Sequence, residues 1–140
     1  MRFLGIDFGL KRIGLALSDP DGLMAFPFQT LVRSSLSHDL QQLETLIFRE
    51  QVTALVVGLP LGLDGQETLT TRQAKNFANK LSARTRLPLH LVNEALTSSQ
   101  AEEELKAAGL PLEKRKAVLD QQAAVIILRT FLESRCHDSD

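Results

Sequence analysis

The chain is poor in the features that staple or anchor a protein. It has one cysteine, Cys136, so no disulfide can form within it, and a reducing compartment is its expected setting. No apolar run approaches the roughly 20 residues that span a bilayer. Charged Asp7, Lys11 and Arg12 interrupt the start of the sequence where a signal peptide would need an apolar stretch. We therefore expect a cytoplasmic protein with no membrane partner.

Aromatic residues and net charge are scarce as well. There is no tryptophan or tyrosine, and Phe8 and Phe28 fit a core equally well, so no platform for stacking bases is evident. The formal net charge of −1 excludes a protein that coats nucleic acid by bulk attraction. Small basic clusters remain and allow a local basic surface, namely Lys11–Arg12, Arg72 with Lys75, and Lys114–Lys116.

What the chain does have is the composition of one globular domain. Hydrophobic residues make up 44% and charged residues 24% of its 140 residues. That length is sufficient to bury a core without disulfides or metal staples. No repeat, low-complexity tract or linker divides the sequence, so we expect a single domain over residues 1–140.

The first third of the sequence predicts three strands. Arg2–Asp7 is short and apolar, and Ile13–Ser18 follows a turn region that contains Gly9. Phe26–Val32 comes after Asp19–Gly22, a strong turn signal. Three strands with short connections predict an antiparallel meander.

Beyond residue 34 the pattern alternates between helices and strands. Leu36, Leu40, Leu43 and Ile47 fall at helical spacing, with Asp39 off that apolar face. A buried strand is expected at Thr53–Val57, followed by a helix with an apolar stripe at Ala74–Leu81 and a short strand at Pro88–Val92. A helix that opens on a capping-box pattern is expected at Thr97–Gly109, and an apolar final helix at Lys116–Glu133.

The resulting order, βββαβαβαα, predicts an α/β fold with a mixed five-stranded sheet and helices on both faces. A ribonuclease-H-like domain requires that order. Other small α/β folds have the same order, so order alone does not decide between them.

Three acidic residues stand where a purely structural role is awkward. Asp7 ends the first apolar run, at the strand end where open α/β sheets place ligands, although an Asp before Phe8-Gly9 also suits a turn. Glu94 follows another strand, where an exposed Glu is ordinary. Asp120 lies on an apolar helix face, where a carboxylate is costly without a partner, and Lys116 four residues earlier is one candidate partner.

Together these carboxylates favour a metal site. Hard oxygen ligands suit Mg²⁺ or Mn²⁺, and the histidines and Cys136 show no zinc-ligand spacing. Two such ions about 3.5–4 Å apart activate water and stabilise the attacking and leaving oxygens of phosphoryl transfer. Cys136 has nothing near it in sequence to activate it as a nucleophile.

Several motifs resemble the YqgF (RuvX) family of pre-16S ribosomal RNA nucleases, which are similar in fold to Holliday junction resolvases. The resemblance covers almost the whole chain in the correct order. Its motifs are Gly5-Ile-Asp7-Phe-Gly9-Leu-Lys-Arg12-Ile-Gly14, Val56-Val-Gly58-Leu-Pro60, Asp64-Gly65, Arg72 with Phe77-Ala78, Glu94-Ala-Leu96-Thr97, and Lys116 with Asp120 and Ala123–Leu128.

The resemblance implies a ribonuclease-H-like nuclease that binds Mg²⁺ or Mn²⁺ through Asp7, Glu94 and Asp120. It also implies processing of the 5′ end of precursor 16S ribosomal RNA, with ribosomal precursor particles as partners. The family's basic positions fall on Lys11, Arg12, Arg72 and Lys116, which we interpret as contacts to the phosphate backbone.

One segment departs from the family pattern. Where the family carries Asp-Glu-Arg, this chain has Asn93-Glu94-Ala95. The central acid is kept, but an arginine that would hold a phosphate or orient Glu94 has become alanine, so reduced or altered activity is an expectation.

Three other functions stay open on the sequence. One is a Holliday-junction resolvase acting on structured DNA, and another is a non-catalytic RNA- or ribosome-binding module. The glycine-rich start also resembles the phosphate-binding hairpin of actin-like ATPases, but those clamp nucleotide between two such domains and this chain has room for one. The sequence does not decide between RNA and DNA, endo- and exonuclease action, or monomer and homodimer.

Overall fold

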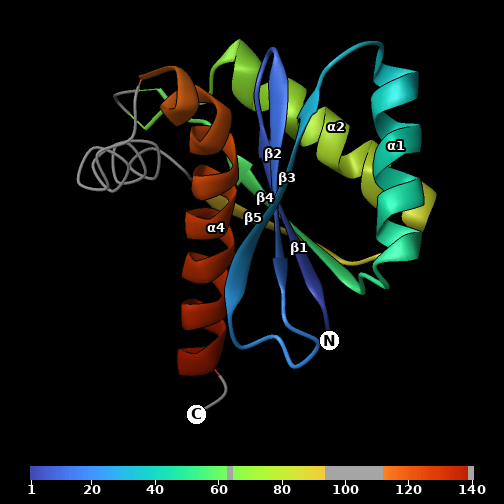
Figure 1. Ribbon diagram of the computed structural model, residues 1–140, viewed down its shortest axis with the longest axis vertical. Coiled ribbons are helices and arrows are strands. Elements are labelled where there is room, and N and C mark those ends of the chain that lie inside the picture. Colours follow the sequence, from blue (N-terminus) through green and yellow to red (C-terminus); the bar gives the residue numbers. More distant parts are fainter. Residues whose placement is uncertain (63–64, 94–111, 139–140) are drawn as a thin grey trace.

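The computed structural model describes residues 1–62, 65–93 and 112–138. Its centre is one five-stranded sheet in the order β3-β2-β1-β4-β5 (Figure 1). The first three strands form the antiparallel meander, and the last two run parallel to β1. The strands are β1 Phe3–Phe8, β2 Arg12–Ser18, β3 Ala25–Val32, β4 Ala54–Leu59 and β5 Leu89–Asn93.

Successive side chains of β1 point to opposite faces of the sheet, and each face carries its own hydrophobic cluster. Leu4, Ile6 and Phe8 join the larger cluster on one face, and Phe3 joins the smaller cluster on the other. β4 is buried at every position, as its apolar sequence predicted. The odd-numbered face of β1 therefore carries Asp7 as well as Phe3.

Two helices cover the larger cluster. α1, Leu36–Arg49, begins at Ser35, whose hydroxyl accepts a hydrogen bond from the His38 N–H at 3.1 Å. α2, Leu69–Thr85, begins at Thr68 with a reciprocal capping box to Thr71. Both helices bury an apolar stripe against the sheet.

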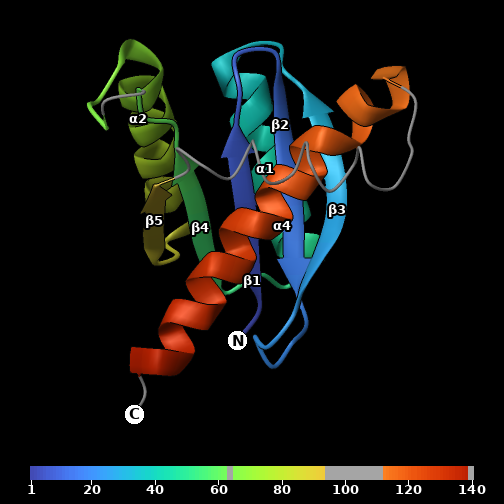
Figure 2. The ribbon, with the colours of Figure 1, turned by 90° about the vertical axis from the view of Figure 1, so that its left-hand side faces the viewer.

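The long final helix, α4, covers the opposite face. It spans Leu112–Asp138 and crosses the sheet diagonally in Figure 2. Gly5 allows this contact, because a Cβ there would lie 2.8 Å from Leu128 Cβ and 3.0 Å from the Ala124 carbonyl oxygen. Among the described helices, none is long and apolar enough to cross a membrane.

A polar turn closes the β2–β3 connection. The N–H groups of Leu23 and Met24 donate to Asp19 Oδ1 at 2.7 and 2.9 Å. These backbone donors, Met24 first, lower the pKa of the Asp19 carboxyl because they stabilise its charged form. The Asp19–Gly22 turn signal therefore has a physical counterpart in the structure.

The predicted fold class and the order of the described elements are confirmed. The expected helix at 97–109 lies outside the described residues, and the last helix is longer than its predicted range of 116–133. The sequence predicts that Asp39 lies off the apolar face of the first helix, and the structure shows that this residue is nevertheless buried. Asp39 is only 1% exposed, because it bonds residues before the helix.

Candidate active site

Asp7 lies in β1, one residue before the end of the strand. Its register partners are Gly14 on β2 and Gly58 on β4. No side chain therefore flanks Asp7 on either neighbouring strand, and the carboxylate is half-buried. Such a position, at the carboxyl edge of central strands, is where open α/β sheets place ligands.

α4 brings Asp120 against Gly14, the neighbour of Asp7 on β2. A Cβ on Gly14 would overlap the backbone carbonyl of Asp120, so helix and strand meet here without a side chain between them. Gly14 is also the residue paired with Asp7. Since adjacent strands lie about 4.8 Å apart, the two predicted carboxylates come from β1 and α4 to one place.

Arg12 completes the contacts of Asp120. Its Nε donates to Asp120 Oδ2 at 2.7 Å, across 108 positions of sequence. The Arg12 side chain is 41% exposed and the Asp120 side chain 22% exposed. Such a solvent-accessible pair adds little to stability, so its main effect is to fix the orientation of the Asp120 carboxylate.

The other predicted site residues are placed less completely. Lys11 is exposed at the β1–β2 turn, and Arg72 is exposed in the first turn of α2, on the other face of the sheet from α4. Lys116 belongs to α4, one turn before Asp120, but its side chain lies outside the description. Glu94 lies outside the described residues, directly after β5 in the sequence.

The β1–β2 turn beside Asp7 is held by Arg33, which the sequence patterns did not indicate. Its backbone N–H donates to the Lys11 carbonyl at 2.9 Å. Its Nη1 lies 3.3 Å from the Gly9 carbonyl oxygen and 3.4 Å from that of Leu10. The guanidinium also stacks on the Phe8 ring, 4.5 Å from its centroid.

Buried Asp39 balances the charge of Arg33. Asp39 Oδ2 accepts from Arg33 Nε at 3.5 Å, and Oδ1 accepts from the Ser34 N–H at 3.0 Å. An acid in the first turn of a helix is ordinary for the helix dipole. The helical spacing in the sequence therefore did not indicate that Asp39 is buried or that it contacts Arg33.

The two described carboxylates fit a divalent cation in part. Among the described residues, no group of three or more His, Cys, Asp or Glu side chains forms a metal cluster. Asp7 and Asp120 supply hard oxygen donors in a half-buried, glycine-lined place, which suits Mg²⁺ or Mn²⁺ rather than zinc. A further ligand must come from outside the described residues or from solvent.

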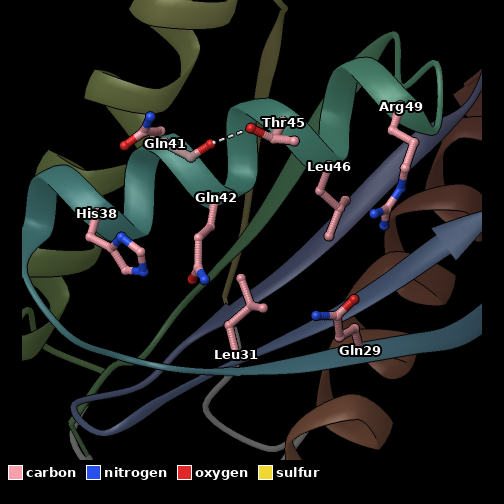
Figure 3. Close-up of a pocket in the computed structure, with 8 residues that line it drawn as sticks. All are labelled: Gln29, Leu31, His38, Gln41, Gln42, Thr45, Leu46 and Arg49. Atoms are coloured by element: carbon pink, nitrogen blue, oxygen red, sulfur yellow. Dashed lines mark hydrogen bonds between the residues drawn. The ribbon is translucent and has the colours of Figure 1, made fainter.

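A separate pocket between β3 and α1 has different chemistry (Figure 3). It holds about 390 Å³ and lies on the face of the sheet away from α4. Thr45 Oγ1 donates to the Gln41 carbonyl at 3.1 Å along its wall. Its lining residues include no carboxylate and so offer no site for a hard metal: Gln29, Leu31, His38, Gln41, Gln42, Thr45, Leu46 and Arg49.

Solved structures place this architecture in a known class. T. thermophilus RuvC in complex with a Holliday junction substrate has a TM-score of 0.64 at 16% identity, covering 98% of this chain and 96% of that one. The Fowlpox virus resolvase, solved with Holliday junction DNA, has a TM-score of 0.63 at 11% identity, covering 96% and 99%. The chain therefore has the ribonuclease-H-like fold of the junction resolvases.

The family follows from sequence. The model of the RuvX family, described as "Holliday junction resolvase", matches residues 1–134. A relative from Maridesulfovibrio salexigens, named "Putative pre-16S rRNA nuclease", is 54% identical over 132 residues, which are 94% of this chain and 98% of the relative. This chain belongs to the RuvX family, and the resemblance to the YqgF (RuvX) nucleases is confirmed.

Proposed function

We propose that this chain is a metal-dependent nuclease that hydrolyses phosphodiester bonds during processing of the 5′ end of precursor 16S ribosomal RNA. The curated relative named as a pre-16S rRNA nuclease supports that substrate. The observation that carries the proposal is local. Asp120 of α4 lies against Gly14, the register partner of Asp7, and this supports one site formed by carboxylates of two separate elements at the carboxyl edge of the sheet.

Asp7, Asp120 and Glu94 are the proposed ligands of Mg²⁺ or Mn²⁺. The first two are half-buried and approach from β1 and α4. Glu94 is assigned from sequence, because it directly follows β5, whose Val92 pairs with the same Gly58 that pairs with Asp7. A bound divalent ion supplies positive charge for the phosphoryl oxygens and lowers the pKa of a bound water.

The basic residues position the substrate and the ligands. Arg12 orients Asp120 through the 2.7 Å contact and is exposed enough to meet a phosphate beside it. Lys11, next to it in the turn, and Arg72 on α2 are exposed and give further backbone contacts. Lys116 is assigned the same role from its place one turn before Asp120. Such contacts fix register without reading sequence.

The reaction itself is a substitution at phosphorus. A water oxygen bonds to the phosphorus atom and one phosphorus–oxygen ester bond breaks. The products are a phosphate monoester on one fragment and a free hydroxyl on the other. The carboxylates hold the reacting centre in place, and Arg12 offers charge to the phosphate oxygens.

The setting follows from the substrate. Precursor ribosomal RNA implies the cytoplasm of a bacterial cell and ribosomal precursor particles as partners. All the proposed acidic and basic residues belong to one chain, so a single copy suffices for cleavage. A homodimer is required only if the substrate is a symmetric four-way junction.

A second candidate is a non-catalytic RNA-binding module. The observation that favours it is Ala95, which stands where the family carries an arginine beside the central acid. Loss of a positive charge at that position weakens the hold on a phosphate. In that case RNA binding persists and cleavage is absent.

Cleavage assays on a panel of substrates separate these functions. Labelled single-stranded RNA, a precursor 16S fragment and a four-way DNA junction are each incubated with Mn²⁺, with Mg²⁺ and with chelator. We expect metal-dependent cutting of the precursor fragment in preference to the others. Preferred cutting of the junction would indicate a DNA resolvase instead. Tight RNA binding without cutting in either metal would favour the binding module and contradict the nuclease.

A further inference from the structure

A groove lies across the β1–β2 turn from the carboxylates, on the opposite face of the sheet. It holds about 320 Å³ between that turn and helices α1 and α2. Its lining includes Phe8, Arg33, Asn76, Phe77 and Lys80. None of the residues given for the groove takes part in the proposed chemistry, so it is a separate feature.

The floor of the groove is apolar and buried. Phe8 is 3% exposed and Phe77 is 1% exposed, and their ring centroids are 4.8 Å apart. Arg33 stacks on Phe8, with 20% of its side chain exposed. A guanidinium held over an aromatic ring and partly open to solvent is a surface on which an unpaired base can stack. The absence of tryptophan and tyrosine therefore does not exclude base recognition here.

The rim of the groove is polar and carries positive charge. Arg33 and Lys80 are its cations, and Gln73 and Asn76 on α2 offer amide donors and acceptors. The lining includes no carboxylate. Asp39 neutralises part of the Arg33 charge from behind, but its side chain is only 2% exposed. The surface presented to solvent therefore favours a ligand that carries both an anionic group, for the two cations, and a hydrogen-bonding group, for the two amides.

Position connects the groove to the candidate active site. Phe8 follows Asp7 in β1, and consecutive strand residues point to opposite faces. The groove and the carboxylates therefore lie on either side of one sheet edge, with exposed Lys11 at the turn between them. Arg72 lies one turn before Asn76 on α2 and extends the basic row.

We infer that this groove binds an unpaired nucleotide of the substrate strand, with single-stranded RNA crossing the β1–β2 turn from the carboxylates to α2. The inference rests on the proposed nuclease function and adds the strand's path. A duplex does not fit this route, because its bases are stacked and paired. The groove therefore selects a single-stranded segment beside the scissile bond.

Binding in chelator tests the groove independently of cleavage. Fluorescence anisotropy measures the affinity of labelled single-stranded RNA for the wild-type chain, Lys80→Gln and Asn76→Ala. Lys75→Gln is the matched control, since Lys75 lies on the same helix, pairs with Glu67 and is not among the groove residues. We expect Lys80→Gln to weaken binding about tenfold and to reduce the salt slope by about 0.7. The Asn76 variant weakens binding with an unchanged slope.

Cross-linking supplies a second measurement. RNA carrying a photoreactive uridine should cross-link to the segment 73–80 of α2. Equal effects of Lys80→Gln and Lys75→Gln, or no binding of single-stranded RNA by the wild-type chain, would overturn the inference. If the groove variants weaken RNA binding but no substrate is cut in Mn²⁺, the groove stands and the nuclease proposal fails.

Discussion

Gly14 is the residue on which the meeting of the two carboxylates depends. It pairs with Asp7, and it leaves no space for a Cβ beneath the Asp120 backbone. In the sequence, Gly14 is a glycine within a predicted strand, and its immediate neighbours do not show why a glycine is needed there. A glycine is needed there because Asp120 of α4 packs against it, and no local pattern contains that information, since Asp120 lies more than 100 positions later in the sequence.

Replacing Gly14 by alanine tests the close approach. The added methyl must push α4 away from β2, so we expect a loss of about 1–3 kcal/mol in the free energy of unfolding. Cleavage should fall further than stability alone explains, because Asp120 moves with the helix. Urea unfolding and single-turnover cleavage measure the two effects. A variant with wild-type stability and wild-type activity would contradict the packing described for this glycine.

Arg12 shows what the sequence indicated and what it did not. The turn cluster with Lys11 predicted a cation near the first strand, and the structure has one. The sequence offered Lys116, whose side chain lies outside the description, as a partner of Asp120, and it did not indicate the contact with Arg12 that the structure shows. Spacing along a helix suggests neighbours within one turn, whereas this pair is set by the packing of α4 on β2.

The Arg12→Gln variant tests the positioning of Asp120. Mutation of a group that orients a metal ligand commonly lowers metal affinity or activity by about 10- to 100-fold. We expect a fall in kcat of that size in Arg12→Gln. Arg49→Gln is the matched control, because Arg49 is an exposed arginine paired with Glu50 away from the site. Wild-type kcat in Arg12→Gln, or an equal fall in both variants, would remove Arg12 from the site.

At the scale of elements, periodicity predicted most of what the structure contains. The apolar spacing of α1 and α2 and the continuous run of β4 each follow from burial against the sheet. Strand ends differ from the predicted ones by one residue, since β1 continues past Asp7 to Phe8 and β2 begins at Arg12 rather than at Ile13. These ends are set by hydrogen bonds to neighbouring strands.

At the scale of elements, the burial of Asp39 is the feature that the sequence did not indicate, and it leads to a prediction of its own. It joins the start of α1 to the β1–β2 turn through Arg33, so its loss leaves a charge and backbone donors without their partner. We expect Asp39→Ala to lower the free energy of unfolding by about 3 kcal/mol. Asp21→Ala is the control, because Asp21 is an exposed aspartate in the β2–β3 turn, and this variant should change the free energy of unfolding little. Equal stability of the two variants would show that Asp39 does not hold the turn.

At the scale of the whole molecule, the chain order decides the layout. A meander followed by two crossovers places β1 at the centre, between an antiparallel and a parallel neighbour. α4 then covers the face that α1 and α2 leave open (Figure 2). The fold class could therefore be predicted from the sequence. The residues of the candidate site could be named from the sequence, but their arrangement could not, because the approach of Asp120 to the strand that pairs with Asp7 depends on tertiary packing.

The central claim is that Asp7 and Asp120 form one metal-dependent centre. The most direct test is single-turnover cleavage of a precursor 16S fragment in Mn²⁺ by the wild-type chain, Asp7→Asn and Asp120→Asn, with Asp21→Asn as the exposed control. We predict that both site variants fall to the rate measured with chelator and lose the rise in Tm that Mn²⁺ gives the wild-type chain. The control should keep both properties. Full metal-dependent cleavage by either folded site variant would contradict the claim.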